Sequence, residues 1–538
     1  MARPRRSLLF VPLAITSFAI LGGIFGPGLT GVSAATASAS PEEDLKSSLK
    51  AFTKVYDVVE QNFADPVTSD KGIYKGAIPG MLRTLDPHSN FFDPKDFSAL
   101  REDQRGHYYG VGMQVGPRNG KTIVIAPFGG SPAYKAGLRP GDVIMEVNDK
   151  RTDNMTTSDI ADLLKGPRGT KVQVVVGRDG VDKPITFNIT RDEIPRYSVP
   201  EAFWIRPGIA YLDVTSFNEN TSKEVEDNLK RLGESNIKGL VLDLRANPGG
   251  LLNEGVAVAG HWLRRGEVVV SHRGRASENK PYVARGSSGG QNYPIVVLVN
   301  QYSASAAEIV SGALQDHDRA WILGETTFGK GLVQTVYPLP ENTGLALTTA
   351  HYYTPSGRLI QRDYSNISFL DYYYGKRTET KNMQDVKSTD SGRVVYGGGG
   401  ITPDEKYEPP KYNKFQTDLL RKFTFFNFTA KWFGARQDAK LPKGWEPDQQ
   451  VVNDFHDFVL KQGTPFTEAE WTENYNWIKQ QLKKEMYATG FSYEESERVA
   501  TEADPMVQKA VDAMPEARAL LDKSKKLIVQ RFDRPDRP

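Results

Sequence analysis

Apolar residues recur at helical spacing just after the first forty residues of the chain. One stripe within EEDLKSSLKAFTKVYDVVEQNF consists of Leu45, Leu49, Phe52, Val55, Tyr56, Val59 and Phe63. This spacing predicts an amphipathic helix, which Ser40 and Pro41 are well suited to begin as cap and first-turn residue. The turn-rich stretch LDPHSNFFDP follows further along. We therefore predict a helical N-terminal segment over residues 40–106.

The pattern changes between residues 107 and 194 to short alternating or β-branched runs that glycine turns separate. Such runs are typical of β-strands. One amphipathic helix is predicted among them, over residues 157–164. We therefore predict a β-rich domain over residues 107–194, with strands at 111–115, 122–126, 143–147, 172–176 and 185–189.

Strand-like and helix-like runs alternate from residue 202 to about residue 375. The strand candidates are IAYLDV, GLVLDL, PIVVLV and WILGE. Helical patterns occur between them at 222–232, at 253–262 and from 304 onward. Such alternation predicts an α/β layer with a largely parallel sheet. The fold class is thus a multidomain α/β protein, with this core over residues 195–410.

The last part of the chain is predicted to be a helical extension. A polar linker after residue 376 and the glycine run 397–400 precede a charged region with apolar residues at helical spacing. We place the C-terminal helical extension at residues 411–538. Its apolar stripe is typical of simple packing, and the sequence leaves open whether the extension forms a homo-oligomer or binds an adaptor.

The N-terminus indicates export. Arg3, Arg5 and Arg6 precede an apolar run that starts at Leu8, and the small residues VSAATASAS follow. This order is that of a signal peptide, with cleavage predicted after Ala34 or Ala39. Because the apolar run is near the lower limit for a membrane span, an uncleaved anchor stays an alternative. Either way, residues 1–39 predict a bacterial periplasmic or cell-envelope protein, which an uncleaved segment would hold at the inner membrane.

The composition excludes several classes of protein. Of 538 residues, 39% are apolar, and 68 basic against 66 acidic side chains give a net charge of +2. This balance excludes a disordered chain and gives no reason to propose nucleic acid as a partner. The chain contains no cysteine. Thiol nucleophiles, disulfides and zinc–thiolate sites are therefore excluded.

The β-rich region carries the features of a peptide-binding domain. A glycine-bearing turn enters its first strand, and AGLRPGDVIMEVN supplies a glycine stop and a further strand. This stretch resembles a PDZ domain of the circularly permuted bacterial type. In that family a peptide adds as a strand beside a loop whose N–H groups bind the terminal carboxylate. The resemblance places this loop at Gly110, Val111, Gly112 and Met113, where glycine lets N–H groups converge.

Three segments of the α/β region carry the candidate chemistry. The turn RANPGG follows a buried strand and leaves backbone N–H groups free, as an oxyanion hole requires. Ser305 begins a helix after the strand PIVVLV, at the positive end of the helix dipole. Lys330 lies between two glycines, with Gln334 four residues further on. A lone serine at a helix start is most often a cap, so the conjunction of the three segments carries the prediction.

Together these segments resemble the C-terminal processing peptidases, also called tail-specific proteases. The family motifs read much like LDLRxNPGG, SASAxEI and GExTFGKGxVQ, and the likeness covers about residues 40–405. It implies a crotonase-like sheet in the protease core. The family spacing selects Ser305 over Ser303 as the nucleophile and makes Lys330 the general base.

The resemblance also implies the supporting groups of the site. Gln334 would orient the lysine amine. The backbone N–H groups of Ala306 and of Gly249 or Gly250 would form the oxyanion hole.

A lysine base must be neutral to accept a proton. A free lysine has a pKa of about 10.4, and catalytic lysines reach about 7 to 8. Burial can lower the pKa by that much. The residues around Lys330 in the sequence offer no carboxylate, and we expect Glu325 to point elsewhere.

Other candidate sites are set aside. His317 and Asp316 lie about three helical turns beyond Ser305, too far for a triad, and His317 is expected to be solvated. The GSSGG run at 286–290 fits G-x-S-x-G but precedes a strand. Ser47 and Lys50 fit S-x-x-K on the solvated face of a helix. No metal-like spacing links the other histidines, which we expect at the surface or in packing: His88, His107, His261, His272, His351 and His456.

The sequence therefore predicts an exported serine endopeptidase. It would bind the free C-terminus of a protein or peptide substrate through its PDZ domain and cleave through an acyl-enzyme, without a metal or cofactor. A non-catalytic peptide-binding scaffold would be expected to lack the Ser–Lys pair, which is present here. The alternative of a crotonase-like enzyme that acts on thioesters would not account for the PDZ domain. The substrate, and whether the PDZ domain inhibits or activates, stay open. Lys165 and Arg168 are candidates for passing the bound state to the active site.

Overall fold

The computed structural model describes residues 41–275, 277–286, 291–365, 367–375, 383–436 and 439–532. They belong to two compact units, which adjoin in the sequence between Ala77 and Ile78. The predicted signal or anchor segment, residues 1–39, lies outside the described residues. None of the helices among the described residues combines the length and the apolar content that a membrane span requires.

The first unit contains the predicted amphipathic helix. It consists of α2 (Pro41–Asn62) and the π-helix η1 (Asp70–Ala77). The side chain of Tyr56 on α2 packs over Gly72 of η1, where an added Cβ would lie 2.8 Å from the ring. The apolar stripe of α2 is exposed along its length.

The second unit begins with short elements that lead to the β-rich domain. They are α3 (Ile78–Arg83), β1 (Asn90–Phe92) and α4 (Pro94–Arg105). The Asp93 side chain caps α4 by accepting the N–H groups of Lys95 and Asp96, and Gly106 ends the helix in the left-handed region. The predicted turn-rich stretch thus also contains a strand, because β1 pairs with β18 (Thr343–Tyr353) far along the chain.

The β-rich domain is a twisted antiparallel sheet with two helices. Strands β2 (His107–Gly110) and β9 (Asp192–Pro195) pair at its entry and exit. The sheet has the order β3-β4-β5-β7-β8, with β6 paired to β5. Its elements are β3 (Met113–Arg118), β4 (Lys121–Pro127), α5 (Pro132–Ala136), β5 (Val143–Val147), β6 (Lys150–Arg151), α6 (Thr157–Leu164), β7 (Lys171–Gly177) and β8 (Ile185–Thr190). The predicted helix and five strands are all present, and β3 is an edge strand.

The α/β core contains the predicted parallel sheet. Its order is β10-β11-β12-β15-β16-β21, with β10 alone antiparallel to its neighbour. The branched side chains of β12 and β15 are buried on both faces. The strands are β10 (Ala202–Arg206), β11 (Ile209–Asp213), β12 (Gly239–Asp243), β15 (Ile295–Val299), β16 (Trp321–Gly324) and β21 (Glu405–Lys406).

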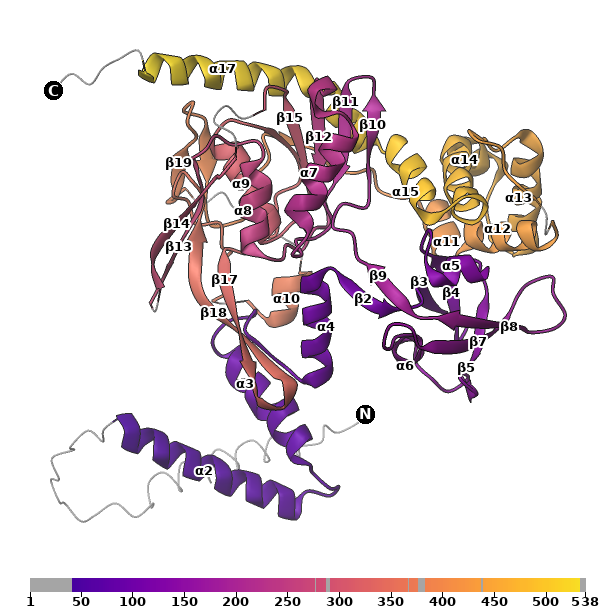
Figure 1. Ribbon diagram of the computed structural model, residues 1–538, viewed down its shortest axis with the longest axis horizontal. Helices are drawn as coiled ribbons and strands as arrows, with labels where there is room; N and C mark the ends of the chain where they lie inside the picture. Colours follow the sequence, from indigo (N-terminus) through magenta and orange to yellow (C-terminus); the bar gives the residue numbers. More distant parts are fainter. Residues whose placement is uncertain are drawn as a thin grey trace, which may run out of the picture. The chain divides into compact units, whose positions relative to one another are not determined.

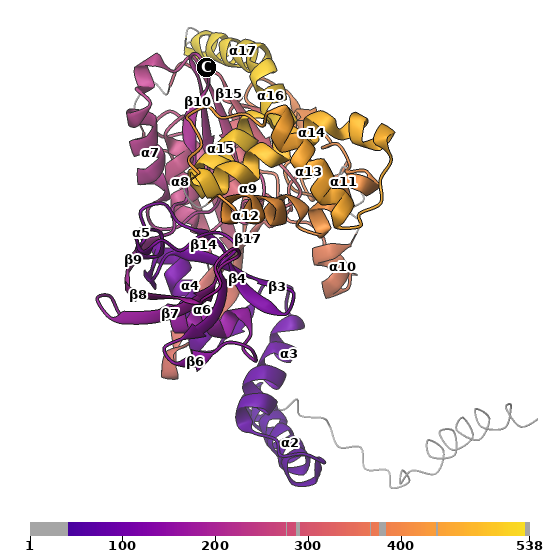
Figure 2. The same ribbon diagram turned by 90° about the vertical axis from the view of Figure 1, so that its right-hand side faces the viewer.

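Helices cover both faces of this sheet (Figures 1 and 2). On one face lie α7 (Thr221–Arg231), with the 3-10 turn η2 (Glu234–Asn236) after it, α8 (Leu252–Gly260) and α9 (Ala306–Asp316). The other face packs against α16 (Pro505–Asp512), through Met506, Val507 and Ala510, and against α17 (Met514–Phe532), through Met514 and Ala517. The end of the predicted C-terminal extension therefore completes the hydrophobic core of the α/β layer.

A second, antiparallel sheet was not predicted. It has the order β1-β18-β13-β14, with β17 paired to β18. The sequence suggested one largely parallel layer, because the long β17–β18 hairpin is mostly half-buried and lacks a continuous apolar run. Its other strands are β13 (Val268–Gly274), β14 (Ser277–Val283) and β17 (Leu332–Leu339), and η3 (Pro340–Asn342) connects β17 to β18. Helix α10 (Phe369–Tyr374) and a separate two-stranded sheet of β19 (Val386–Ser388) and β20 (Val394–Tyr396) follow along the chain.

The next four helices form their own apolar cluster beside the β-rich domain (Figure 1). They are α11 (Lys414–Arg421), α12 (Thr424–Gly434), α13 (Gln449–Lys461) and α14 (Glu468–Gly490), and α15 (Tyr493–Glu502) follows them. Aromatic rings make T-shaped, tilted and stacked contacts in this cluster, such as Phe425 stacked on Phe455 at 4.7 Å.

Candidate active site

Ser305 lies on a sharp turn between β15 and α9. Its φ and ψ are 55° and −114°, a sparsely populated region for a residue with a side chain. The predicted helix therefore begins one residue after Ser305, at Ala306. Such strain persists only where surrounding contacts fix the backbone, and here the Ser305 N–H donates to Glu308 Oε2 at 2.8 Å.

Glu308 is a buried carboxylate that joins the two candidate catalytic segments. Its Oε2 atom accepts the backbone N–H of Ser305 and, at 2.9 Å, that of Lys330. Its Oε1 atom accepts the Gly329 N–H at 2.7 Å and the Thr327 hydroxyl at 2.5 Å. Burial raises the pKa of Glu308, and these four hydrogen bonds oppose the change. One side chain thus fixes Ser305 and Lys330 relative to each other, a role that the sequence analysis missed.

Tyr352 forms a second bridge between the same segments. This residue of β18 is buried, and its hydroxyl hydrogen-bonds with the Ser305 side chain and donates to the Lys330 carbonyl. The hydrogen bonds of the described residues include none between Ser305 Oγ and Lys330 Nζ. Catalytic hydrogen bonds often close only when substrate binds. Tyr352 was missed because nothing local in HYYTPSG marks it.

Lys330 has the environment of a lysine that loses its proton easily. Burial lowers its pKa, and the carboxylates of Glu308 and Asp86 oppose that change. The Nζ atom donates to Gln334 Oε1 at 2.9 Å, so Gln334 lies where the sequence analysis placed it. Glu325 is not among the residues that change the pKa of Lys330, in line with the expectation that it points elsewhere. The sequence neighbours of Lys330 offer no carboxylate, but the fold brings those of Glu308 and Asp86 to it from distant segments.

The turn at residues 86–89 supports Gln334. The Gln334 amide nitrogen donates to the His88 carbonyl, which leaves the amide oxygen facing Lys330. The Asp86 carboxylate holds this turn by accepting from the His88 and Ser89 N–H groups and from the Ser89 hydroxyl. His88, expected at the surface or in packing, is therefore part of the site through its backbone.

The ring of His88 is neutral. Burial and the charge of Lys330 lower its pKa to about 3. Its Nε2 and Nδ1 atoms lie 3.0 Å from the hydroxyls of Tyr372 and Tyr373. These contacts anchor α10 beside the site.

The RANPGG turn places its two glycines behind Ser305. A Cβ on Gly249 would lie 2.6 Å from Ser305 Cβ, and one on Gly250 would lie 2.1 Å from the Phe217 oxygen. Both have positive φ angles, so only glycine fits. The Gly249 N–H donates to Asn247 Oδ1 at 2.8 Å. The hydrogen bonds of the described residues leave the N–H groups of Gly250 and Ala306 without an acceptor.

Two neighbouring residues hold the turns in place. Ser303 Oγ donates to the Leu244 carbonyl at 2.7 Å and accepts the Asn300 N–H at 3.0 Å, so it is a buried turn residue, as expected. Arg245 pairs with Asp243 at 2.6 Å and with Asp504, the N-cap of α16, at 2.7 Å. The last helices thus brace the end of β12.

The β-rich domain contains a groove of about 770 Å³ between β3 and α6. Gly110 ends β2, Met113 begins β3, and Val111 and Gly112 form the loop between them. The predicted strand starts at 113 instead of 111 because Gly112 has φ 76°. A Cβ there would lie 2.5 Å from Ser131 Cβ. Val111, Gly112 and Met113 line the groove.

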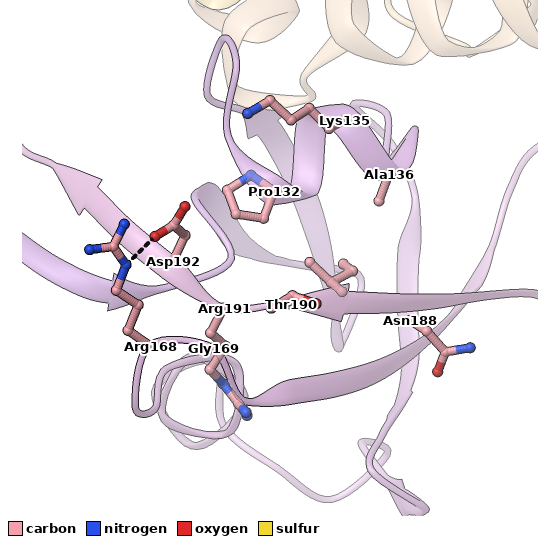
Figure 3. Close-up of a pocket in the computed structure, with 10 residues that line it drawn as sticks. Pro132, Lys135, Ala136, Arg168, Gly169, Asn188, Thr190, Arg191 and Asp192 are labelled. Carbon is pink, nitrogen blue, oxygen red and sulfur yellow. Dashed lines mark hydrogen bonds and ion pairs between the residues drawn. The ribbon is translucent and has the colours of Figure 1, made fainter.

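A second pocket of about 530 Å³ lies on the same domain (Figure 3). Arg168 lines it and pairs with Asp192 at 2.7 Å. Lys165 instead pairs with Glu102 of α4 at 2.7 Å. Lys165 therefore connects the domain to α4, whereas the Arg168 ion pair stays within the domain.

The remaining candidates stay outside the site. His317 is not solvated as expected: its ring contacts Asp390 at 2.9 Å and the Val268 carbonyl at 2.8 Å. Although burial opposes protonation, these hydrogen bonds raise the pKa of His317 to about 9. Ser47 and Lys50 are exposed on α2. Residues 287–290 of the GSSGG run lie outside the described residues.

Comparison with known proteins gives consistent matches. The sequence matches the family model of peptidase family S41 over residues 208–366 and that of the PDZ domain over residues 129–178. It is similar to the carboxy-terminal-processing protease of Bartonella bacilliformis, with 36% identity over 63% of this chain and 79% of the relative.

Two further relatives are similar over much of the chain. The carboxy-terminal processing protease CtpA of Bacillus subtilis is 32% identical, over 60% of this chain and 72% of the relative. Among solved structures, the photosystem II D1 C-terminal processing protease aligns with 30% identity and a TM-score of 0.35. That alignment covers 66% of this chain and 87% of the other.

Proposed function

Because this chain belongs to the carboxy-terminal-processing proteases of peptidase family S41, we propose that Ser305 is its nucleophile and Lys330 its general base. The observation that carries this proposal is the pair of bridges between the two residues. Glu308 binds both backbone N–H groups, and Tyr352 contacts the Ser305 side chain and the Lys330 carbonyl. A lysine whose pKa burial lowers can be neutral when substrate binds.

The reaction then follows the usual course of acyl transfer. Neutral Lys330 accepts the Ser305 hydroxyl proton as Oγ attacks the peptide carbonyl, and passes that proton to the leaving amine. Water next loses a proton to Lys330 and attacks the acyl-enzyme, which releases the acid and restores Ser305. Gln334 keeps the amine of Lys330 directed toward Ser305.

The oxyanion is proposed to bind the N–H groups of Ala306 and Gly250. Both lack an acceptor among the described residues, whereas the Gly249 N–H already donates to Asn247. Of the two glycines that the sequence left open, Gly250 therefore has the free donor. Two free N–H groups next to the nucleophile supply the stabilisation that acyl transfer requires.

The PDZ groove is proposed to bind the substrate's C-terminus. Both loop carbonyls are used, because Val111 O accepts from Ala133 and Gly112 O accepts from Phe128. The hydrogen bonds of the described residues leave the N–H groups of Val111 and Gly112 without an acceptor. A carboxylate can accept both while the peptide pairs with the edge of β3.

The cellular setting rests on the N-terminal sequence. We propose export to the periplasm or cell envelope because of the basic start, apolar run and small residues at 1–39. Membrane anchoring by that segment stays a prediction, as does contact of the C-terminal extension with a second copy or an adaptor.

The dyad is tested by replacing its two members in the full-length enzyme. Ser305→Ala and Lys330→Met are each expected to lower peptide cleavage by at least about 10³-fold. Ser311→Ala, a buried serine in the same helix, is the matched control and should keep most of the activity. Substantial cleavage by Ser305→Ala would contradict the assignment.

The stability of the Lys330→Met protein as a function of pH distinguishes a lysine base from a structural lysine. A lowered pKa means that, between that pKa and the usual lysine value of 10.5, the folded protein binds fewer protons than the unfolded chain. Its stability therefore rises with pH through that window. The methionine variant lacks this dependence and should melt higher than the parent at pH 7. Equal melting curves from pH 6 to pH 10 would argue against a lowered pKa.

A further inference from the structure

The C-terminal extension packs directly on the PDZ domain. Arg118, at the end of β3, lies over the ring of Phe426 at 4.7 Å and over that of Phe423 at 5.6 Å. A Cβ on Gly180, in the β7–β8 connection, would lie 2.9 Å from the Gly434 oxygen. Both ribbon views place the helices of the extension beside β3 and β4 (Figures 1 and 2).

The start of α15 reaches the peptide groove itself. Tyr493 and Glu494 line the groove together with the carboxylate-binding loop. The Gly129 N–H donates to Glu494 Oε1 at 3.2 Å. The segment that carries Gly129 is tied to the loop, because the Phe128 N–H and Ser131 Oγ both donate to the Gly112 carbonyl. The Glu494 carboxylate therefore lies in the groove lining near the carboxylate-binding loop, along the path of the last residues of a bound peptide.

Some of the charged residues that line the groove form salt bridges with other described residues, and others do not. Asp192 pairs with Arg168, Lys165 with Glu102, and Arg196 with Asp103. Within the described part of the chain, Glu193 and Glu494 form no salt bridge, and neither does Lys135, the remaining cation of the lining. The lining of the groove thus contains two carboxylates without a salt bridge to any described residue, Glu193 and Glu494, and one such lysine, Lys135.

We propose that Glu494, supplied by the C-terminal extension, is a specificity-determining residue of the PDZ groove. It favours substrates with a lysine or arginine among the three residues before the terminal one, and disfavours acidic residues there. The inference rests on the proposed function of the groove as a reader of C-termini. Because Glu494 is exposed, the expected preference for lysine over glutamine is about two- to fivefold, and salt should screen it.

The test measures binding without cleavage. Full-length Ser305→Ala protein is titrated against fluorescein-labelled free-acid peptides that carry lysine, glutamine or glutamate at each of these three positions. At low salt, lysine should bind best and glutamate worst at one or more positions. Glu494→Gln should remove the order, and Glu494→Lys should reverse it.

The matched control is Glu495→Lys, which changes the same charge on the adjacent exposed residue of α15. This variant should keep the parent's order. Reversal by both variants would mean a diffuse field effect, and an unchanged order in Glu494→Lys would overturn the proposal. Melting temperatures confirm that the variants are folded.

Amidated peptides distinguish a failure of the role of Glu494 from a failure of the proposed function of the PDZ domain, on which that role rests. If the amidated and free-acid peptides bind equally well, the groove does not read C-termini and the proposed function of the PDZ domain fails. If free acids bind better but the three side chains are not distinguished, only the role of Glu494 fails.

Discussion

The site around Ser305 and the loop at Gly112 both present backbone N–H groups, but they hold them in different ways. Around Ser305, a buried carboxylate and a buried tyrosine fix the two catalytic segments. At Gly112, the loop's carbonyls are bonded within the domain, and one wall of the groove comes from a separate helical extension. The proposed chemistry relies on buried contacts, whereas the proposed recognition relies on N–H donors without acceptors among the described residues and on an exposed wall.

This difference also predicts how each region responds to change. A buried carboxylate with four donors has no substitute, so its loss should affect both turnover and folding. An exposed residue such as Glu494 can be exchanged with small effects. Removing groups from the two regions should therefore give effects of very different size.

Among the groups that support the two regions, Glu308 is expected to give the largest effect, when it is replaced by glutamine. A glutamine offers one acceptor oxygen and one NH₂ group, so two of the four donors would face another donor. We expect about a 10²-fold loss of turnover and a loss of about 3 kcal/mol in the free energy of unfolding. Peptide cleavage and urea unfolding measure both, and Glu254→Gln, a half-buried carboxylate of α8, is the control. Unchanged turnover would show that the Glu308 bridge does not matter for catalysis.

A smaller effect is expected at the groove. Amidating a substrate's C-terminus leaves the N–H groups of Val111 and Gly112 without their charged acceptor. Losing such a bond costs about 1.5–3 kcal/mol, or roughly a ten- to hundredfold weaker interaction. Rates for matched free-acid and amidated peptides measure this. Deletion of residues 107–194 should abolish the difference between the two peptides. Equal rates for both peptides on the intact enzyme would mean that the domain is only a structural spacer.

The smallest effect on activity is expected at Glu201, where the core meets the C-terminal extension. Its side chain is buried, Oε2 accepts from Thr501, and Oε1 has no partner among the described residues. Burial raises its pKa to about 7, with Glu497 and Asp243 adding to the change and Lys484 opposing it.

The raised pKa of Glu201 determines whether stability rises or falls with pH. Between the usual glutamate pKa of 4.5 and about 7, the folded protein binds more protons than the unfolded chain, so stability falls as pH rises. Glu201→Gln removes this loss and should stabilise the protein at pH 8 by up to about 3 kcal/mol, with little change at pH 4 and in peptide cleavage. Thermal unfolding across this range measures the effect. Glu495→Gln, which is exposed, should not show it.

The sequence predicted the local elements well. The helix Thr157–Leu164 and the strand Val143–Val147 appear with the predicted bounds, because apolar periodicity and flanking glycines are local signals. The motifs around Ser305, Lys330 and Gln334 also predicted which segments carry the candidate chemistry. The antiparallel sheet was missed, since its hairpin is only half-buried and alternates weakly.

The sequence by itself thus determined the family motifs, the order of the elements and the separation of a peptide-binding domain from an α/β core. Only the tertiary structure placed Tyr352 against Ser305, the His88 carbonyl against Gln334, and Glu494 in the groove of another domain. These contacts join residues that are 47, 246 and 365 positions apart (305 to 352, 88 to 334, 129 to 494). Local periodicity reports which face of an element is buried, but a hydrogen-bond partner depends on how distant elements align when they pack.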